Sequence, residues 1–316
     1  MHLSQQPGSA PIGKRLFARI VNNPKCDVKP GNSEQFLLES AGKLKLDLTF
    51  LDPPFNQGKQ YDSHDDSMPA NEYWNWMTRI CKLTFENTNP GGAIYFMHRE
   101  KNTEHVLKSL RESGWTFQNL IIWKKKTSAV PNIRRFGLHY QIIAFATKGN
   151  RPKAFHKLRI DPPMLVNEKI RRPTGMYATD VWDDIRELTS GYYAGDEPLR
   201  GRDGRRIHKQ QSPVRLLVRI ILSSTNVGDM VFDPFAGTGT TLVVAKQLDR
   251  DSLGIELDPK YFSLIKDRIE HLRQSDYIGR HRKEYRHTNR LNHIWHVEQQ
   301  GNQPTQVLPS GEKTHK

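Results

Sequence analysis

Short apolar runs alternate with amphipathic stretches along most of the chain. Apolar runs typical of buried strands cover residues 16–21, 46–51, 92–97, 117–123, 140–147, 229–233 and 252–257. Between several of these runs, apolar residues recur at helical spacing over residues 71–87, 100–113, 213–225, 240–249 and 259–273. Strands that alternate with helices favour a mainly parallel sheet with helices on both faces. The pattern therefore predicts an α/β fold.

The segment at residues 150–207 interrupts this rhythm. It contains several prolines and glycines and no long periodic run. A structureless connection of that length is unusual inside a compact domain, so an inserted module or a set of ordered loops is predicted. Residues 1–15 are polar and are predicted to be disordered. Residues 276–316 are predicted to form a basic C-terminal extension, in which a solvated basic helix or a segment touching nucleic acid is favoured over a metal site.

The charge balance points to a class of partner. The 316 residues include 48 Lys and Arg against 34 Asp and Glu, a formal net charge of +14. This excess favours a polyanion such as nucleic acid, with a generally solvated basic surface as the alternative. Cys26 and Cys81 form no CxxC pair, so neither a disulfide framework nor a zinc ribbon is predicted. No apolar stretch approaches the ~18 residues of a membrane span and no signal-peptide core is visible, so a cytoplasmic protein is expected.

A Gly-rich turn at residues 229–241 (DMVFDPFAGTGTT) follows an apolar strand and begins a helix. Such turns let backbone N–H groups approach a ligand closely. Gly237 and Gly239 fill the first two positions of a dinucleotide fingerprint, but Leu242 replaces the third glycine. Glu256 ends the next strand at a spacing suited to ribose hydroxyls, and Asp233 would repel a phosphate but attract an ammonium group. These residues favour S-adenosylmethionine over a nicotinamide dinucleotide; a turn that merely joins strand to helix is the alternative.

A second motif, Asp-Pro-Pro-Phe at residues 52–55, follows the buried strand at 46–51. Two consecutive prolines fix the course of the loop and remove two donors. Asp52 and the Pro53 carbonyl can each accept one N–H of an exocyclic amine, while Phe55 can stack on the base. The similar Asp-Pro-Pro-Met at 161–164 lacks both the strand and the aromatic residue, and is interpreted as a turn. The first motif therefore predicts a pocket for a nucleobase, with a strand-ending turn as the alternative.

The two motifs together resemble those of amino-group DNA methyltransferases in which the catalytic motif precedes the cofactor motif, the β order. DPPF at 52–55 is similar to the family's catalytic motif, and DPFAGTGTT at 233–241 to its S-adenosylmethionine motif. The resemblance implies a Rossmann-like methyltransferase sheet with a catalytic half at 16–149 and a cofactor-binding half at 208–275. The segment at 150–207 stands where the family has its target-recognition region.

The resemblance also implies roles for individual residues. Those that would hold the target base are Asp52, Pro53, Pro54 and Phe55. Those that would hold the cofactor are Asn32, Gln211, Asp233, Phe235, Gly237, Gly239, Thr240, Thr241 and Glu256. Two positions depart from the family pattern: Asn32 stands where Asp is common, and Ser212 where Lys usually precedes Pro213. No metal is implied.

The resemblance favours N6 of adenine as the methyl acceptor. In the family, Asp at the first position of the catalytic motif usually accompanies adenine and Ser accompanies cytosine, so N4 of cytosine is the alternative to what Asp52 favours. Methylation of cytosine C5 needs a Cys nucleophile beside Pro, which neither Cys26 nor Cys81 provides. RNA or protein-glutamine methylation stays open. A non-catalytic DNA-binding module is disfavoured because the catalytic motif is complete.

A base inside duplex DNA must be flipped out to reach such a pocket. The basic residues predicted to lie along the phosphates are Lys124, Lys125, Lys126, Arg134 and Arg135, with a solvated charge run as the alternative. Residues 55–76 are predicted to form a lid, whereas the aromatic residues Tyr73, Trp74 and Trp76 are expected to pack in the core. Double-stranded DNA is the expected partner, in a bacterial, archaeal or phage-encoded protein. The sequence does not show whether a cognate restriction endonuclease exists, or whether the protein is a monomer or a homodimer.

Overall fold

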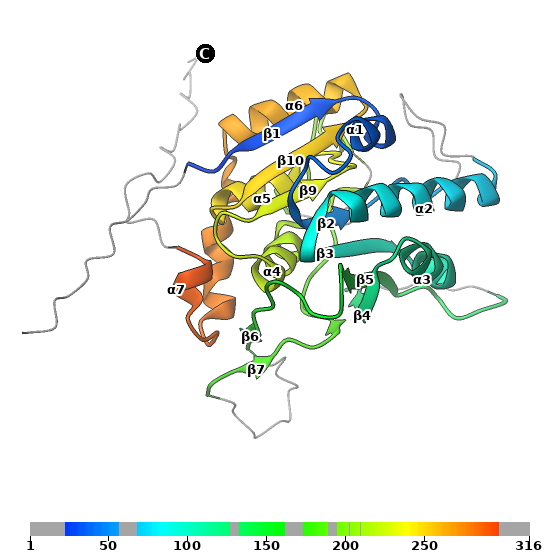
Figure 1. Ribbon diagram of the computed structural model, residues 1–316. Coiled ribbons are helices and arrows are strands. Elements are labelled where there is room, and N and C mark those ends of the chain that lie inside the picture. Colours follow the sequence, from blue (N-terminus) through cyan, green and yellow to red (C-terminus); the bar gives the residue numbers. More distant parts are fainter. Residues whose placement is uncertain are drawn as a thin grey trace, which may run out of the picture.

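An eight-stranded sheet forms the centre of the structure (Figure 1). The computed structural model describes residues 23–56, 68–126, 133–161, 173–188, 195–201, 203–208 and 210–296. In sheet order the strands are β1 (Cys26–Pro30), β10 (Asp251–Glu256), β9 (Met230–Asp233), β2 (Leu46–Leu51), β3 (Thr88–Arg99), β5 (Tyr140–Thr147), β4 (Thr116–Lys124) and β8 (Val181–Trp182). Strand β5 is antiparallel to both neighbours, and all other pairs are parallel. The predicted mainly parallel sheet is confirmed.

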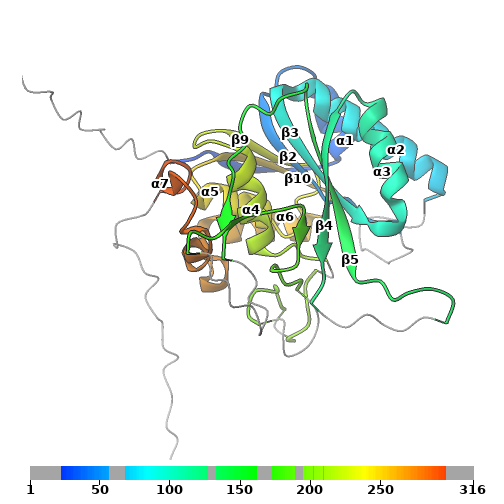
Figure 2. The same ribbon diagram turned by 90° about the horizontal axis from the view of Figure 1, so that it is seen from below.

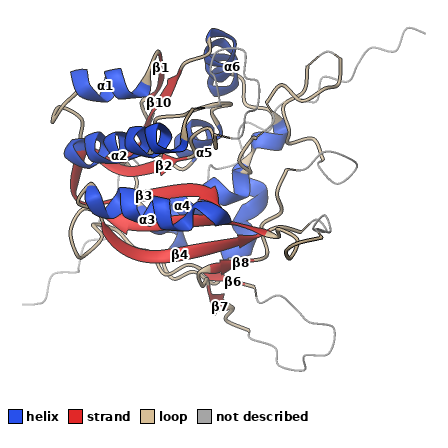
Figure 3. Cartoon of the chain, turned by 90° about the vertical axis from the view of Figure 1, so that its right-hand side faces the viewer, coloured by secondary structure: helices blue, strands red, loops and turns tan. Residues whose placement is uncertain are grey.

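Helices cover both faces of the sheet (Figure 3). On one face lie α1 (Ser33–Glu39), α2 (Ala70–Asn87) and α3 (Thr103–Glu112), the last preceded by a 3-10 turn at Glu100–Asn102. On the other lie α4 (Val214–Ser224) and α5 (Thr240–Gln247), while α6 (Pro259–Glu270) packs beside β1 and α5. Within the described ranges, none of the helices combines the length and apolar character that crossing a membrane requires.

Burial on both faces explains the composition of the central elements. All six residues of β2 (LDLTFL) are buried, as expected of a parallel strand between two layers of helices. Helix α4 is buried almost all round because it lies between the sheet and the C-terminal segment. Its Arg219 is also buried, and Asp184 accepts hydrogen bonds from that guanidinium at 2.5 and 2.7 Å. Cys26 and Cys81 are both free thiols.

Two elements ahead of β2 were not anticipated by the sequence pattern. Strand β1 has five residues, of which only Val28 is buried, and α1 has seven residues, so neither gives a long periodic signal. The strand predicted at 16–21 lies outside the described residues. The other predicted strands and helices are present, with ends that differ by a few residues.

The described parts of the predicted insert, residues 150–207, contain short strands. β6 (Arg159–Ile160) and β7 (Met176–Tyr177) form an antiparallel pair, and β8 extends the central sheet beside β4. Asp161, which begins the second Asp-Pro-Pro sequence, is exposed and pairs with Arg286 and His287. The residues that follow it, 162–164, lie outside the described part of the chain. The role of residues 150–207 in recognising the DNA sequence stays a prediction.

Residues 276–296 pack onto the domain. The 3-10 segments Gln274–Asp276 and Ile278–Tyr285 are followed by α7 (Leu291–Ile294). Tyr285 and Trp295 are buried in the same core as α4. These residues therefore do not form the predicted solvated basic helix. Their few apolar side chains alternate with basic ones at a spacing that lets the apolar ones reach the core. Residues 1–22 and 297–316 lie outside the described part of the chain.

Candidate active site

The carboxyl ends of β2 and β9 lie side by side at the centre of the sheet. The two strands are parallel neighbours, with Leu48 opposite Val231. The chain leaves β2 through α2 toward β3, and leaves β9 through α5 toward β10, on opposite sides of this pair. The strand order reverses here, and such switch points are where α/β sheets bind ligands.

A pocket with an empty volume of about 1080 Å³, open mouth included, lies at this switch point. It is large enough for a ligand of nucleoside size. The predicted site residues that line it are Asn32, Asp52, Pro53, Pro54, Asp233, Phe235, Gly237, Thr240, Thr241 and Glu256. Phe55, Gln211 and Gly239 are not among the lining residues. The structure thus brings two motifs that are far apart in the sequence into one site.

The Gly-rich turn follows β9 and leads into α5. Gly237 and Gly239 have φ values of 54° and 77°, in the left-handed region that favours glycine. A side chain at Gly239 would meet Ile265 of α6, since a Cβ there would lie 2.8 Å from Ile265 Cγ2. Gly237 faces the pocket, whereas Gly239 allows α6 to pack closely against the turn.

Two carboxylates face the pocket from the ends of β9 and β10. Glu256 accepts hydrogen bonds from the backbone N–H groups of Gly237 (2.7 Å) and Asp258 (2.9 Å), and burial raises its pKa to about 7. Asp233 accepts from the backbone N–H of Phe235 at 3.0 Å, and burial raises its pKa to about 6. Carboxylate oxygens have lone pairs to spare for a ligand. A ligand with positive charge and hydroxyl donors would favour their ionised forms.

Asp52 lies in the same pocket, at the end of β2. Desolvation raises its pKa to about 8; the Ser212 hydroxyl, which donates to Asp52 Oδ2 at 3.0 Å, opposes this shift, and the charge of Asp233 adds to it. Ser212 occupies the position where the family that the sequence resembles usually has Lys. Among the described residues, no group of three or more His, Cys, Asp or Glu is arranged to hold a metal ion.

The Asp-Pro-Pro-Phe loop is anchored from α2 and β3. The Tyr73 hydroxyl donates to the Pro54 carbonyl at 2.7 Å and lies 3.0 Å from His98 Nε2. Phe55 is buried, and its ring lies against the imidazole of His98 with centroids 4.6 Å apart. In this structure Phe55 therefore fixes the loop by packing against His98 on the side away from the pocket. Pro53 and Pro54 form part of the pocket wall.

The hydrogen bonds around His98 identify its tautomer. Its Nδ1 accepts from the backbone N–H of Arg99 at 2.8 Å and lies 3.1 Å from Asn102 Nδ2, so Nδ1 carries no proton. Burial, with the charge of Arg99, lowers the pKa of His98 to about 3, and the ring is neutral at pH 7. The proton therefore resides on Nε2 and is donated to Tyr73, which in turn donates to Pro54.

Trp76 packs against the core, as expected, and it also lines the pocket. Its ring contacts Phe235 edge-on, with centroids 5.6 Å apart. Trp76 lies three residues after Tyr73 on α2, and side chains at this spacing share a helix face. The sequence alone did not indicate this position, because the contact between Tyr73 and the catalytic loop is seen only in the structure. Of the predicted lid at 55–76, residues 57–67 lie outside the described residues, and residues 70–76 belong to α2.

Residues 208–213, between the insert and α4, do not all face the way that the sequence predicted, since Gln211 was expected to hold the cofactor. Gln211 is turned away from the pocket, because its Oε1 accepts from Leu199 N and its Nε2 donates to Glu197 O. The residues of this segment that do line the pocket are His208, Gln210 and Ser212. Asn32 lines the pocket too, but its Oδ1 caps α1 by accepting from the backbone of residues 34 and 35.

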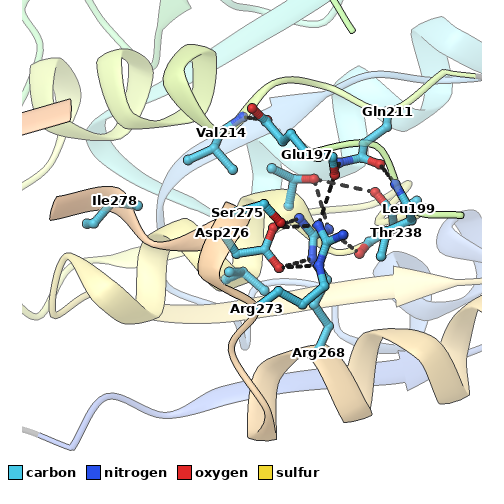
Figure 4. A network of polar contacts seen from close by, with 12 residues as sticks. Glu197, Leu199, Gln211, Val214, Thr238, Arg268, Arg273, Ser275, Asp276 and Ile278 are labelled. Atoms are coloured by element: carbon cyan, nitrogen blue, oxygen red, sulfur yellow. Dashed lines mark hydrogen bonds and ion pairs between the residues drawn. The ribbon is translucent and has the colours of Figure 1, made fainter. Parts of the chain in front are cut away.

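A buried ionic network contacts the Gly-rich turn through Arg268 (Figure 4). Arg268 donates to Thr238 O at 2.7 Å and pairs with Asp276, and both side chains are almost completely buried. Asp276 also accepts from Arg273, which donates to Glu197 O. Burial alone would raise the pKa of Asp276, but hydrogen bonds from the two arginines outweigh it and lower the pKa. The network joins the turn to the insert and to the C-terminal segment.

The predicted phosphate-binding residues lie on the pocket's edge of the sheet. Lys124 and Lys126 are exposed at the carboxyl end of β4, which is parallel to β2, and burial lowers the pKa of Lys125 between them. Arg134 and Arg135 are exposed on the connection to β5. Residues 127–132 lie outside the described part of the chain.

A family model described as DNA methylase, for N6 and N4 methyltransferases, matches residues 46–267. The Type II methyltransferase M2.DpnII of Streptococcus pneumoniae is 31% identical over 240 residues, which cover 71% of this chain and 82% of that protein. The Type II methyltransferase M.HpaI of Haemophilus parainfluenzae is 29% identical over 234 residues, covering 74% of this chain and 71% of that protein.

Solved structures share the fold. The PvuII DNA methyltransferase, which is cytosine-N4-specific, matches with a TM-score of 0.58 at 18% identity, covering 84% of this chain and 93% of the other. A Thermus thermophilus protein described as a candidate DNA modification methylase, in complex with S-adenosyl-L-methionine, matches with a TM-score of 0.51 at 21% identity, covering 77% and 93%. At these identities the likeness concerns the fold alone.

Proposed function

This chain belongs to the DNA methylase family of N6 and N4 amino methyltransferases, and on that premise we propose that it methylates N6 of an adenine flipped out of duplex DNA, with S-adenosylmethionine as the methyl donor. The observation that carries the proposal is the placement of Asp52 and Asp233 in one pocket, at the ends of adjacent strands. One motif supplies acceptors for an amine, and the other supplies carboxylates for a cationic nucleoside.

The donor set of the pocket fits this cofactor. Glu256 would accept the ribose hydroxyls, and Asp233 would attract the positively charged methionine portion. Gly237 lets the backbone approach the ligand, while Thr240 and Thr241 begin α5 beside it. When bound, the cofactor supplies an electrophilic methyl group on its sulfonium.

The catalytic loop would hold the amine of the target base. Asp52 and the Pro53 carbonyl would accept its two N–H groups, since the Pro54 carbonyl is engaged by Tyr73. Drawing on these hydrogens makes the nitrogen more sp³-like and hence more nucleophilic. The nitrogen loses one proton as it gains the methyl group, and a carboxylate whose pKa lies near the working pH is suited to accept it. No covalent enzyme intermediate is needed.

Adenine is proposed over cytosine because Asp occupies the first position of the catalytic motif. The test is to express the protein in a host without DNA methyltransferases of its own and to identify modified nucleosides by mass spectrometry. N6-methyladenine is the expected product, and sequencing of the modified positions would give the recognition sequence. N4-methylcytosine instead would contradict the adenine assignment.

Replacing Ser212 by Ala is expected to raise the pKa of Asp52 further, because the variant lacks the hydroxyl that stabilises the charged form. If ionised Asp52 is required, the pH of half-maximal kcat/KM should rise by roughly half to one unit, the equivalent of one hydrogen bond. A pH–rate profile of the wild type and of Ser212→Ala measures this shift. An unchanged midpoint would show that Ser212 does not set the pKa of Asp52.

Replacing Tyr73 by Phe is expected to slow methyl transfer about tenfold, because the Pro54 carbonyl loses the donor that fixes the loop. The affinity for cofactor should stay the same. Tyr95→Phe is the matched control, since it also removes a buried hydroxyl, which is bonded to Ser224 Oγ at 2.7 Å between β3 and α4. Equal loss of activity in both variants would argue for a general packing effect.

Lys124, Lys125 and Lys126 are proposed, with Arg134 and Arg135, to bind DNA phosphates. Changing the three lysines to Gln should weaken binding and flatten the dependence of log K on log salt by about 0.9 for each phosphate that is no longer neutralised. Binding measured over a range of salt concentrations tests this. A slope that stays the same would assign these lysines to the solvated surface.

A further inference from the structure

Two apolar side chains on the connection between β4 and β5 are fully exposed. Ile133 is 103% exposed and Phe136 is 97% exposed, whereas no other large hydrophobic residue in the described ranges exceeds 56%. A single partly exposed hydrophobic side chain is ordinary on a protein surface. Two fully exposed hydrophobic side chains within four residues form an apolar area that is available to a partner.

The charges around this pair indicate the kind of partner. Arg134 and Arg135 stand between the two apolar residues and are exposed, and three lysines end the preceding strand. The carboxylate of Glu187 also lies at this end of the strand, where it accepts from the backbone N–H of Lys126 at 2.8 Å. An apolar tip set among guanidinium groups is complementary to stacked bases between phosphates.

The position of the connection fits the same partner. The backbone N–H of Lys125 donates to His139 O at 2.8 Å, which continues the β4–β5 ladder past its end. Figure 2 shows the described part of the connection extending away from the ends of both strands. In the sheet, β5 and β4 are two and three strands from β2, or roughly 10–15 Å at ordinary strand spacing. The tip therefore extends from the same edge of the sheet as the pocket that contains Asp52.

We propose that Ile133 and Phe136 form an apolar wedge that enters the duplex and occupies the space vacated by the target base. The proposal rests on the proposed function. Flipping costs a few kcal/mol of stacking and pairing. Phe136 would stack on the neighbouring bases and Ile133 would fill the gap, while Arg134 and Arg135 hold the adjacent phosphates.

The test uses the double variant Ile133→Ala/Phe136→Ala. Its substrate is a duplex that contains the recognition sequence, as found by sequencing the modified positions in DNA. Single-turnover methyl transfer should fall about tenfold to a hundredfold, the worth of the missing stacking. The fluorescence of 2-aminopurine at the target position, which rises on flipping, should fall in parallel. The cofactor affinity and Tm should stay the same. Phe117→Ala is the matched control, because Phe117 is an exposed aromatic residue at the opposite end of β4.

A second substrate separates the wedge from other causes. A duplex with an abasic site opposite the target already has a weakened pair, so the double variant should regain most of its rate on it. A defect of equal size on both duplexes, or no defect on either, would overturn the wedge while leaving the methyltransferase intact. A wild-type dimer that dissociates in the double variant would overturn it by assigning the pair to self-association. Wild-type protein that methylates neither duplex would overturn the proposed function itself.

Discussion

Replacing Asp52 by Ala should lower the rate of methyl transfer by at least about a thousandfold, because the variant loses both an acceptor for the amine and the group placed to take up its proton. The raised pKa of Asp52, about 8, reflects its desolvated position in the pocket. Single-turnover transfer with labelled S-adenosylmethionine measures the effect.

The sequence contains its own control for this variant. Asp161 begins the second Asp-Pro-Pro sequence, but it is exposed and pairs with Arg286 away from the pocket. Asp161→Ala should therefore keep full activity, and Asp52→Ala should keep its affinity for cofactor. Substantial transfer by Asp52→Ala, or an equal loss in the two variants, would remove Asp52 from the catalytic role.

Replacing Asp276 by Ala should destabilise the protein by about 3–5 kcal/mol, because Arg268 would remain as a buried charge without its carboxylate. Arg268 is 1% exposed and Asp276 is 0% exposed, so water cannot replace the missing partner. The melting temperature should fall by roughly 10 °C. The cofactor affinity should weaken as well, since Arg268 also supports Thr238 in the Gly-rich turn.

Asp267→Ala is the matched control, on α6, the helix that carries Arg268. Asp267 pairs with His271, but both side chains are more than 70% exposed. Exposed pairs of this kind contribute little. Thermal or urea unfolding of the two variants distinguishes them, and an equally small change in both would show that the Arg268–Asp276 pair does not hold the turn.

The parts of the site that the sequence could predict are those set by local signals. Asp52, Asp233 and Glu256 each end a buried apolar strand, and the carboxyl ends of parallel strands lie on one edge of a sheet. The motifs therefore fixed both the residues and the side of the sheet before any tertiary contact was known. The same reasoning placed the lysines that follow β4 on this edge.

The parts that could not be predicted depend on long-range contacts. Gln211 and Ser212 are neighbours in an irregular segment, and contacts with Glu197 and Leu199 determine that Ser212 faces the pocket. Phe55 turns to the core because His98, on a different strand, offers it a ring to pack against. Such choices leave no periodic signal in the sequence.

In the mechanism that we propose, one pocket joins the methyl group of the cofactor to the amino group of adenine. Its most direct test is to incubate the purified protein with methyl-labelled S-adenosylmethionine and unmethylated genomic DNA, digest the DNA, and identify the labelled nucleoside. The label is expected in N6-methyladenine. Label in N4-methylcytosine would contradict the assignment of the base, and the absence of label from DNA would contradict the proposed function as a whole.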